Sequence, residues 1–475
     1  MAEVSQRKRI WGWMAFDWAT QPFYTLGLTF VFSPYFADVS EGYYLDRLSD
    51  AEAADAASQA LWFWGQTIAG LLIAFTAPLV GAYADSTGRR LPWIWGFAAI
   101  YGAATFALWW TFPDASTLIL MLIIFNIGFI AAEYMLVFVN AILPSLGDKE
   151  EVGRISGNGA ALGYWGGVLS LFVMLLFFVE NETGKTLANI DPALGLDASE
   201  REGARSVGPF IALWFALFII PFFAFTREPA SANLSGGVPQ AWADLKQSLR
   251  GAMGRRSLLN FLLSSMFYRD ALNALYAAGG IYAVLVLDWS IIQIGVFGIF
   301  GAITAAVATQ VGGLFDERLG PRPVIRFCCG LLILVCLPFV GMSQTDFFGL
   351  ITFNPEPMAT LPLIGALTMP DLIFYLCGAA IGGAGGAIYA ASRSMMVRHT
   401  HPERPTEAFG LFALSGKATS FLAPGLITLT SWLTGSAQLA YIPVIGLFVL
   451  GLYLLRFVNP EGDAEEWSKS AIPLP

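Results

Sequence analysis

Charged side chains are scarce in this chain, and the shortage excludes a water-soluble protein. Of the 475 residues, 13% are charged and 56% are hydrophobic, whereas soluble proteins average about 25% charged residues. Too few polar side chains remain to cover a surface that faces water. Long uncharged runs such as 71–80 and 118–127 take their place, and roughly 20 apolar residues in a helix cross a bilayer core. The composition predicts an integral membrane protein.

Histidine and cysteine are also few, which argues against a metal centre or a disulfide framework. The four cysteines lie in apolar stretches, where free thiols behave as small hydrophobic side chains. His399 and His401 flank a predicted helix end, and we expect both to be solvated. No phosphate-cradling loop and no Ser/His/Asp set is present, so we expect no cofactor and no enzymatic activity. The net charge of −9 reflects acid-rich loops at 38–55 and 180–202, which we interpret as solvated.

The apolar runs predict about twelve transmembrane helices. We expect them at 10–37, 59–84, 91–112, 117–145, 155–180, 206–226, 258–287, 290–315, 322–342, 370–397, 407–433 and 438–458. The chain then divides into a first bundle (1–226), a linker (227–257), a second bundle (258–458) and a tail (459–475). The segment 343–369 is the one place where the count could change by one.

Lysine and arginine are unevenly distributed over the predicted loops, and this sets the orientation. Cytoplasmic loops of membrane proteins carry an excess of these residues. Most of the 26 lie at the termini and on the linker side, and the opposite face holds Arg47, Lys185, Arg201 and Arg205. We therefore expect both termini to be cytoplasmic.

Two similar motifs stand at matching places in the two halves. Each has a glycine, three residues, an aspartate, a turn glycine and then cations, beginning at Gly81 and at Gly312. Related halves with a binding site at their interface are a common transporter plan. The motifs resemble the signature loop of the major facilitator superfamily, and this resemblance implies a cytoplasmic latch formed by Gly81, Asp85, Arg89, Arg90, Asp316 and Arg318. An ordinary positive loop is the alternative for a single copy.

Small residues recur in the helix expected at 155–180. Gly159, Gly163 and Gly167 are four residues apart and share one face. Such stripes let membrane helices pack closely, and this is our interpretation. A surface on which helices slide is the functional alternative.

Several segments together resemble the vacuole-effluxer-like branch of the major facilitator superfamily. They are Phe16-Asp17-Trp18-Ala19, the stretches 139–144 and 156–167, and the stretch from Ser392-Arg393-Ser394 to Pro424. The resemblance runs from about residue 10 to 430. It implies an all-α major facilitator fold with two pseudo-symmetric six-helix bundles and a central cavity lined by the first, fourth, seventh and tenth helices. It also implies a monomer in the bacterial inner membrane. The branch includes a yeast effluxer of vacuolar amino acids, but the chain departs from the usual pattern at 20–22 and 269–271.

Ionisable and polar residues lie inside the predicted helices, where a charge costs at least about 2.5–3.5 kcal/mol at the bilayer centre. Such residues persist when they pair or line water. Asn126, Glu133 and Asn140 recur every seven residues as a polar stripe. We predict a substrate site formed by Asp17, Gln21, Glu133, Asn140, Arg269, Asp270, Asn273 and Lys417. The alternative is an ion-pair network that only joins helices, and Arg393 could simply cap a helix or reach the interface.

Acids and cations together suit a zwitterion, so the leading hypothesis is a secondary active transporter of an amino acid or related solute that works by alternating access. Glu133 and Asp17 are the candidate proton carriers, because a desolvated carboxylate can hold a proton. A sugar, lipid or drug transporter is one alternative, and a transport-dead sensor or scaffold is another. The expected partners are a small-molecule solute and the lipid bilayer, with no nucleic acid.

Overall fold

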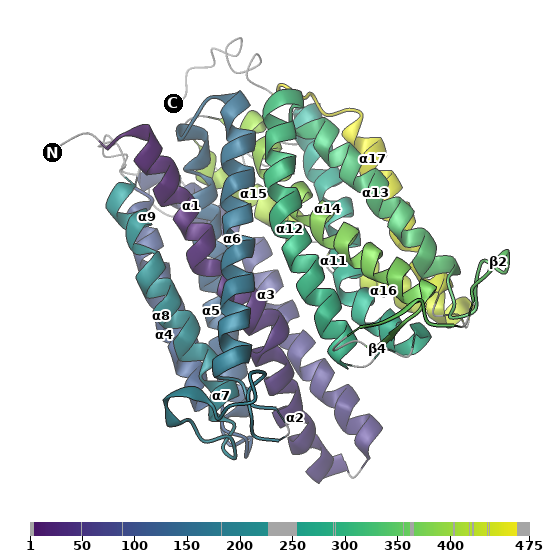
Figure 1. The fold of residues 1–475 in the computed structure, drawn as a ribbon. Coiled ribbons are helices and arrows are strands. Elements are labelled where there is room, and N and C mark those ends of the chain that lie inside the picture. Colours follow the sequence, from purple (N-terminus) through teal and green to yellow (C-terminus); the bar gives the residue numbers. More distant parts are fainter. Residues whose placement is uncertain are drawn as a thin grey trace. The chain divides into compact units, whose positions relative to one another are not determined.

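The computed structural model of this protein is built almost entirely from helices (Figure 1). It describes residues 4–226 and 254–462, apart from 49, 88, 182, 288, 290, 355, 362–364, 402–403, 418, 420–421, 435 and 437. The predicted tail from 463 onward and most of the predicted linker lie outside the described residues.

Each predicted span coincides with a helix. In the first half these are α1 (Gln6–Pro22) with the π-helical segment η1 (Phe23–Phe30), α3 (Ala51–Thr87), α4 (Leu91–Ala107), α5 (Leu118–Asn140), α6 (Lys149–Phe177), and the sixth span made of α7 (Glu202–Arg205), α8 (Val207–Phe218) and α9 (Ile220–Phe225). In the second half they are α11 (Arg256–Leu287), α12 (Ile291–Leu319), α13 (Pro321–Gly341), α14 (Met369–His399), α15 (Pro405–Lys417) with α16 (Leu422–Thr434), and α17 (Ile442–Leu455). Within the described residues, nine helical stretches are long and apolar enough to cross a membrane. The predicted all-α membrane fold is confirmed.

The helices group into two compact units. Unit 1 comprises Met1–Ile142 and Leu162–Ala241, and unit 2 comprises Leu143–Ala161 and Trp242–Pro475. The division therefore passes through α6, whose first half belongs to unit 2 and whose second half belongs to unit 1. The predicted bundle and linker boundaries stay predictions.

In unit 1 the second half of α6 packs closely against α1. A Cβ atom added to Gly163 would lie 3.1 Å from the carbonyl oxygen of Asp17, and one added to Gly166 would lie 3.0 Å from that of Trp18. A Cβ on Gly167 would lie 3.0 Å from Cγ of Gln21. These distances are shorter than most Cβ contacts, so the small size of glycine lets the two helices approach this closely. The packing interpretation of the glycine stripe is confirmed at Gly163 and Gly167.

In unit 2 the first half of α6 packs against α12 through another pair of glycines. A Cβ on Gly157 would lie 2.6 Å from the Cα of Gly313. One turn away, a Cβ on Gly153 would lie 2.7 Å from Oδ1 of Asp316. The two helix backbones are therefore in direct contact along this stretch, and α6 covers the carboxylate of Asp316.

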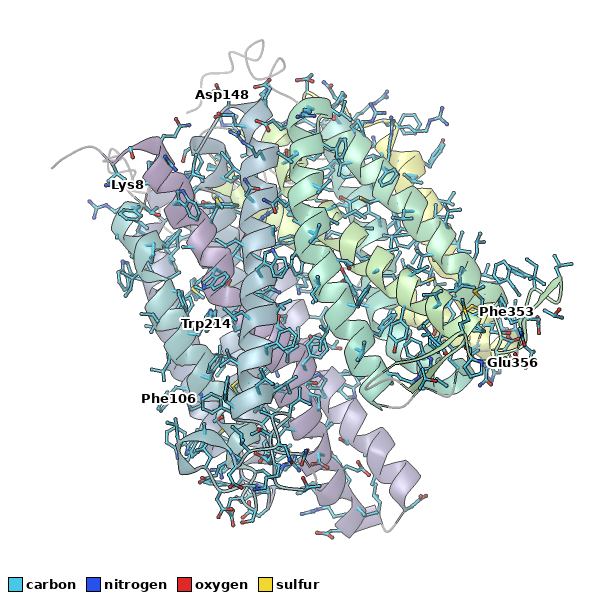
Figure 2. The ribbon with its side chains drawn as sticks, viewed as in Figure 1. Lys8, Phe106, Asp148, Trp214, Phe353 and Glu356 are labelled. Atoms are coloured by element: carbon cyan, nitrogen blue, oxygen red, sulfur yellow. The ribbon has the colours of Figure 1, made fainter. Side chains whose placement is uncertain are left out.

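The described residues of the segment 343–369 form two short antiparallel strand pairs, and they add no helix before α14. Strand β1 (Asp346–Phe347) pairs antiparallel with β2 (Ile351–Thr352), and β3 (Ala359–Leu361) pairs antiparallel with β4 (Gly365–Leu367). Figure 2 labels Phe353 and Glu356 in the stretch that joins the two strand pairs. Gly349 and Gly365 take positive φ values of 66° and 73°, which glycine adopts readily. The predicted count of twelve spans is unchanged.

The first helix and the acid-rich stretch after it differ from the prediction. Pro22 has no N–H to donate, and the helix widens to π geometry over Phe23–Phe30. The chain then continues as α2 (Phe32–Leu48), and α3 begins at Ala51. Most of the stretch 38–55, predicted as a loop, is therefore helical.

His399 is buried, which contradicts the prediction that it is solvated. Its exposed fraction is 1%. Helix α14 continues to this residue and packs on α11, so the ring stacks on Phe261 with centroids 5.6 Å apart. The Ser257 hydroxyl lies 2.7 Å from Nε2, and the Met395 carbonyl lies 2.9 Å from Nδ1. Both ring nitrogens have polar partners, and burial costs less as a result.

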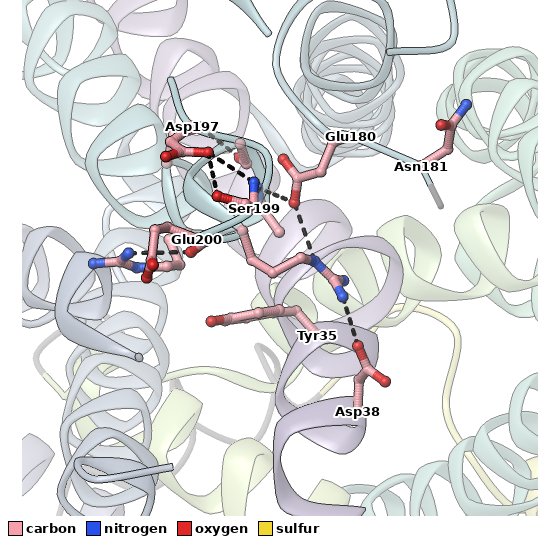
Figure 3. A network of polar contacts seen from close by, with 12 residues as sticks. Tyr35, Asp38, Glu180, Asn181, Asp197, Ser199 and Glu200 are labelled. Atoms are coloured by element: carbon pink, nitrogen blue, oxygen red, sulfur yellow. Dashed lines mark hydrogen bonds and ion pairs between the residues drawn. The ribbon is translucent and has the colours of Figure 1, made fainter. Parts of the chain in front are cut away.

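The loop between α6 and α7 is fastened to α2 by a polar network (Figure 3). Arg201 donates to Glu180 at 3.1 Å and to Asp38 at 2.8 Å. Glu180 is 7% exposed, so this member of the acid-rich loop is buried and paired, and the prediction that it is solvated was wrong. Nearby, the hydroxyl and amide of Ser199 donate to Asp197 and lower the pKa of that carboxyl.

A leucine at Gly163 tests the contact between α1 and α6. We expect Gly163→Leu to destabilise the purified protein by about 1–3 kcal/mol, because an added side chain must push α6 away from Asp17. Thermal unfolding in detergent measures the change. Gly330→Leu in α13 is the control, since a Cβ there meets nothing within 4 Å. Equal melting temperatures for the two variants would contradict the packing argument.

Candidate functional site

The polar cluster of unit 1 lies on α1, η1 and α5. Asp17 is buried at 8% exposure and Gln21 is half-buried one turn further along. The hydroxyl of Tyr24, in the π-helical segment, donates to Oε1 of half-buried Glu133 at 3.1 Å. Asn140 ends α5 and is buried. The predicted acids and amides of this half are therefore carried by adjoining helices, and Tyr24 is an additional member that the prediction missed.

The stripe on α5 continues toward α3. Nε2 of Gln66 donates to Oδ1 of Asn126 at 3.3 Å, and the hydroxyls of Thr76 and Tyr134 are hydrogen-bonded to each other. Asn126 and Glu133, two residues of the predicted polar stripe, thus have hydrogen-bonding neighbours on α3 and η1. Polar side chains inside a membrane helix are stabilised by such partners.

In unit 2, Arg269 and Asp270 meet the two pieces of the eleventh span. Nη1 of Arg269 donates to the carbonyl of Phe412 in α15 at 3.2 Å, and its guanidinium lies 4.5 Å from the centre of the Phe412 ring. Oδ2 of Asp270 accepts a hydrogen bond from the N–H of Ala423 in α16 at 2.9 Å. Asp270 is 3% exposed, and its Oδ1 has no hydrogen-bond partner among the described residues.

Asp270 lies beside a helix end whose partial charge is opposite to its own. Ala423 is the second residue of α16, where free N–H groups give a partial positive charge, and Asp270 accepts a hydrogen bond from one of them. Phe412 lies in the middle of α15, and its carbonyl also accepts a hydrogen bond from the Ser415 hydroxyl at 2.8 Å. Arg269 therefore contacts the body of α15, whereas Asp270 contacts the start of α16.

The remaining predicted residues of unit 2 are less enclosed. Asn273, one turn after Arg269, is exposed, and Lys417 is half-buried at the last position of α15. Tyr268 is buried and its hydroxyl lies 2.7 Å from that of Ser392 in α14. Ser392 and Tyr268 are further polar members of this cluster, and they were not among the predicted site residues.

Arg393 is fully buried and connects α14 to the first half of α6. Its Nε donates to Oγ of Ser156 at 3.0 Å, and its Nη2 donates to the Ser156 carbonyl at 2.7 Å. Its guanidinium lies 4.7 Å from the centre of the Tyr389 ring. The Ser156 hydroxyl in turn donates to the Ala390 carbonyl at 2.9 Å. Arg393 therefore joins two helices of unit 2 and has no exposed surface.

The two latch motifs have unequal surroundings. Asp85 forms an ion pair with Arg90 at 3.1 Å. Asp316 is 1% exposed and accepts a hydrogen bond from the Ser394 hydroxyl at 3.2 Å. Gly81 is buried, whereas Arg89 and Arg318 are exposed. The repeated sequence thus forms a part-buried ion pair in unit 1, where the Asp85 side chain is 4% exposed, and a buried carboxylate under α6 in unit 2.

A family model described as "Vacuole effluxer Atg22 like" matches residues 5–467. The chain belongs to this family. Among curated relatives, the uncharacterized MFS-type transporter YxiO of Bacillus subtilis (strain 168) is 24% identical over 470 residues, covering 98% of this chain and 97% of the relative. Autophagy-related protein 22 of Cryptococcus neoformans (strain JEC21) is 24% identical over 336 residues, covering 66% of this chain and 52% of the relative. The match thus spans about half the length of that fungal relative.

Solved structures with the same fold include the proton:xylose symporter XylE bound to 6-bromo-6-deoxy-D-glucose. The TM-score is 0.66 at 14% identity, covering 97% of this chain and 98% of XylE. A bacterial homologue of the iron transporter ferroportin in an outward-facing state gives 0.63 at 13% identity, covering 98% and 99%. The predicted major facilitator fold and effluxer-like family are confirmed. The chain is a membrane transporter of the major facilitator type and not an enzyme.

Replacement of Asp270 by asparagine or by alanine distinguishes two roles of its carboxylate, the anchoring of α16 and a requirement for negative charge in transport. We expect Asp270→Ala to destabilise the protein by about 0.5–2 kcal/mol through loss of a helix N-cap. We expect Asp270→Asn to keep most of the stability and of the transport, because an amide oxygen also accepts from Ala423. Thermal unfolding and solute flux measure the two effects. If Asn abolishes transport while keeping stability, the negative charge itself is required and the anchoring role is insufficient.

Proposed function

We propose that this transporter carries an amino acid or a related zwitterion. The observation that supports the proposal is that the polar residues inside the spans carry charges of both signs. The polar cluster of unit 1 contains the carboxylates of Asp17 and Glu133, and that of unit 2 contains the cations Arg269 and Lys417 together with the carboxylate of Asp270. Carboxylates accept hydrogen bonds from an ammonium group, and cations donate them to a carboxylate.

The contacts favour unequal roles among the predicted residues. Arg269 already donates to the Phe412 carbonyl in α15, and Asp270 already accepts from Ala423 at the start of α16, so we assign them to positioning. Lys417, half-buried at the end of α15, is the better candidate for the solute carboxylate. Glu133, with Tyr24 as its hydrogen-bond donor, is the candidate for the ammonium group or for a coupled proton. Asp17, Gln21, Asn140 and Asn273 complete the proposed set.

A neutral solute is the second candidate. The fold is shared with a symporter of xylose, and unit 1 holds Gln21, Asn140 and Tyr24, which are the amide and hydroxyl types that sugars engage. The buried carboxylates beside them are costly to place in a membrane, and a neutral solute does not need them. This favours the zwitterion.

We further propose alternating access with the two units as the moving parts, in a monomer in the bacterial inner membrane. Both termini lie in the cytoplasm in this proposal, since most lysines and arginines lie at the termini and in the loops on that side. The direction of transport follows from the gradient of the solute or of a coupled ion.

A thermal-shift screen with matched variants tests the solute class. We expect amino acids, and neither sugars nor nucleosides, to raise the melting temperature, because a ligand that binds the folded state stabilises it. Glu133→Gln and Lys417→Gln should each weaken binding on the order of tenfold, about 1.4 kcal/mol, while Arg47→Gln in the exposed end of α2 should have no effect. A shift produced by sugars and unchanged in Glu133→Gln would contradict the proposal.

Removal of the Arg393 side chain tests the contact between α14 and the first half of α6. We expect Arg393→Met to increase hydrogen–deuterium exchange in 149–161, because the two hydrogen bonds to Ser156 are lost. Transport should slow if this contact forms and breaks in every cycle. Arg326→Met is the control, since Arg326 is exposed on α13. Unchanged exchange in Arg393→Met would show that the glycine contacts alone hold α6.

A further inference from the structure

Unit 1 has an apolar groove on its surface, apart from the polar cluster. It has a volume of about 560 Å³ and lies between α4 on one side and α8 with α9 on the other. All of its lining residues are apolar, and the small ones among them are Ala98, Ala99, Gly102, Ala212, Ala216 and Ala224. No lining side chain offers a hydrogen bond to a solute, apart from the indole N–H of Trp95.

The groove forms because its small residues lie next to surface positions that carry large side chains. On the same helix α8, Leu213 and Leu217 are exposed by 66% and 61%, and they face outward beside Ala212 and Ala216. A Cβ added at Gly102 would meet nothing within 4 Å. The hollow is therefore set by residue size, and a chain thinner than a helix can enter it.

One end of the groove is aromatic and adjoins positive charge. The rings of Trp95 and Phe223 stack with centroids 3.7 Å apart. Two residues beyond Phe223, the Phe225 ring has Nζ of Lys8 at 5.9 Å from its centre. Helix α1 packs closely at this place, since a Cβ atom added to Gly12 would lie 3.1 Å from the Cβ atom of Phe225. Figure 2 shows Lys8 at the end of unit 1 opposite to Phe106.

A second basic segment approaches the same end along α4. Arg89 is exposed and directly precedes Arg90, the N-cap residue of α4. At 1.5 Å of rise per residue, Trp95 lies about 8 Å along the helix axis from Arg90. Arg90 is paired with Asp85, whereas the exposed side chains of Arg7 and Lys8 extend from the start of α1. Cations therefore gather at the aromatic end of the groove.

We propose that the groove binds one acyl chain of an anionic phospholipid whose phosphate is held near Lys8 and Arg89. The apolar walls fit a hydrocarbon chain, and basic residues at a membrane surface attract anionic lipid headgroups. Trp95 lies near the start of α4, at one end of the predicted span, and tryptophan is enriched at membrane interfaces.

The test uses delipidated full-length protein in detergent. Phosphatidylglycerol should raise the melting temperature more than phosphatidylcholine does, and native mass spectrometry should detect one retained phosphatidylglycerol. Water-soluble glycerol 3-phosphate should give no shift, because it lacks the acyl chain. Equal shifts from the two phospholipids, or a shift from glycerol 3-phosphate alone, would overturn the proposal.

Variants that fill the groove distinguish a lipid bound in it from the lipids that surround the whole protein. Gly102→Phe should weaken retention of phosphatidylglycerol about tenfold, and Ala216→Phe should do the same from the opposite wall. Gly96→Phe is the matched control, because Gly96 is also on α4 with open space around it but does not line the groove. Lys8→Glu should remove the preference for phosphatidylglycerol over phosphatidylcholine. Retention that survives both filling variants, or that Gly96→Phe lowers equally, would place the lipid elsewhere.

Discussion

Inside a membrane every backbone polar group must find a partner within the protein, and this constraint governs the structure at its most unusual point. The described residues of the eleventh span form α15 and α16, and the first N–H groups of α16 need partners outside that helix. Neighbouring α11 supplies one through Asp270, which accepts from Ala423, while Arg269 donates to the carbonyl of Phe412 in α15. We therefore assign these two charges to the scaffold. Glu133 and Lys417 are left as the stronger candidates for solute contact.

The same constraint explains why glycine is prominent in the helix contacts. Helices that satisfy their own hydrogen bonds attract each other in lipid mainly through close packing, and closeness requires small residues. Helix α6 uses this twice, through Gly153 and Gly157 toward α12 and through Gly163 and Gly167 toward α1. One helix thus belongs to both units, and its two halves pack on different partners.

The fold was largely predictable because long apolar runs, spaced loops and paired motifs are local properties of a sequence. The partners of individual polar residues were not, since they are distant in sequence: Asp270 and Ala423 are 153 positions apart. Pro424, in the first turn of α16, is a signal that could have placed the helix break, because proline is favoured there. Tyr24 could have been found seven residues after Asp17. The burial of His399 could not, because it depends on the exact length of α14 and on Ser257 from another helix.

The division of α6 between two units has a consequence for how the protein is made. Ser156 donates to the carbonyl of Ala390, which follows it by 234 positions. A ribosome that has just completed α6 has therefore synthesised a segment whose partners do not yet exist. The second half of α6 can settle against α1 at once, but the first half must wait until α12 and α14 enter the membrane. The final structure of the first half of the chain is thus completed only near the end of synthesis.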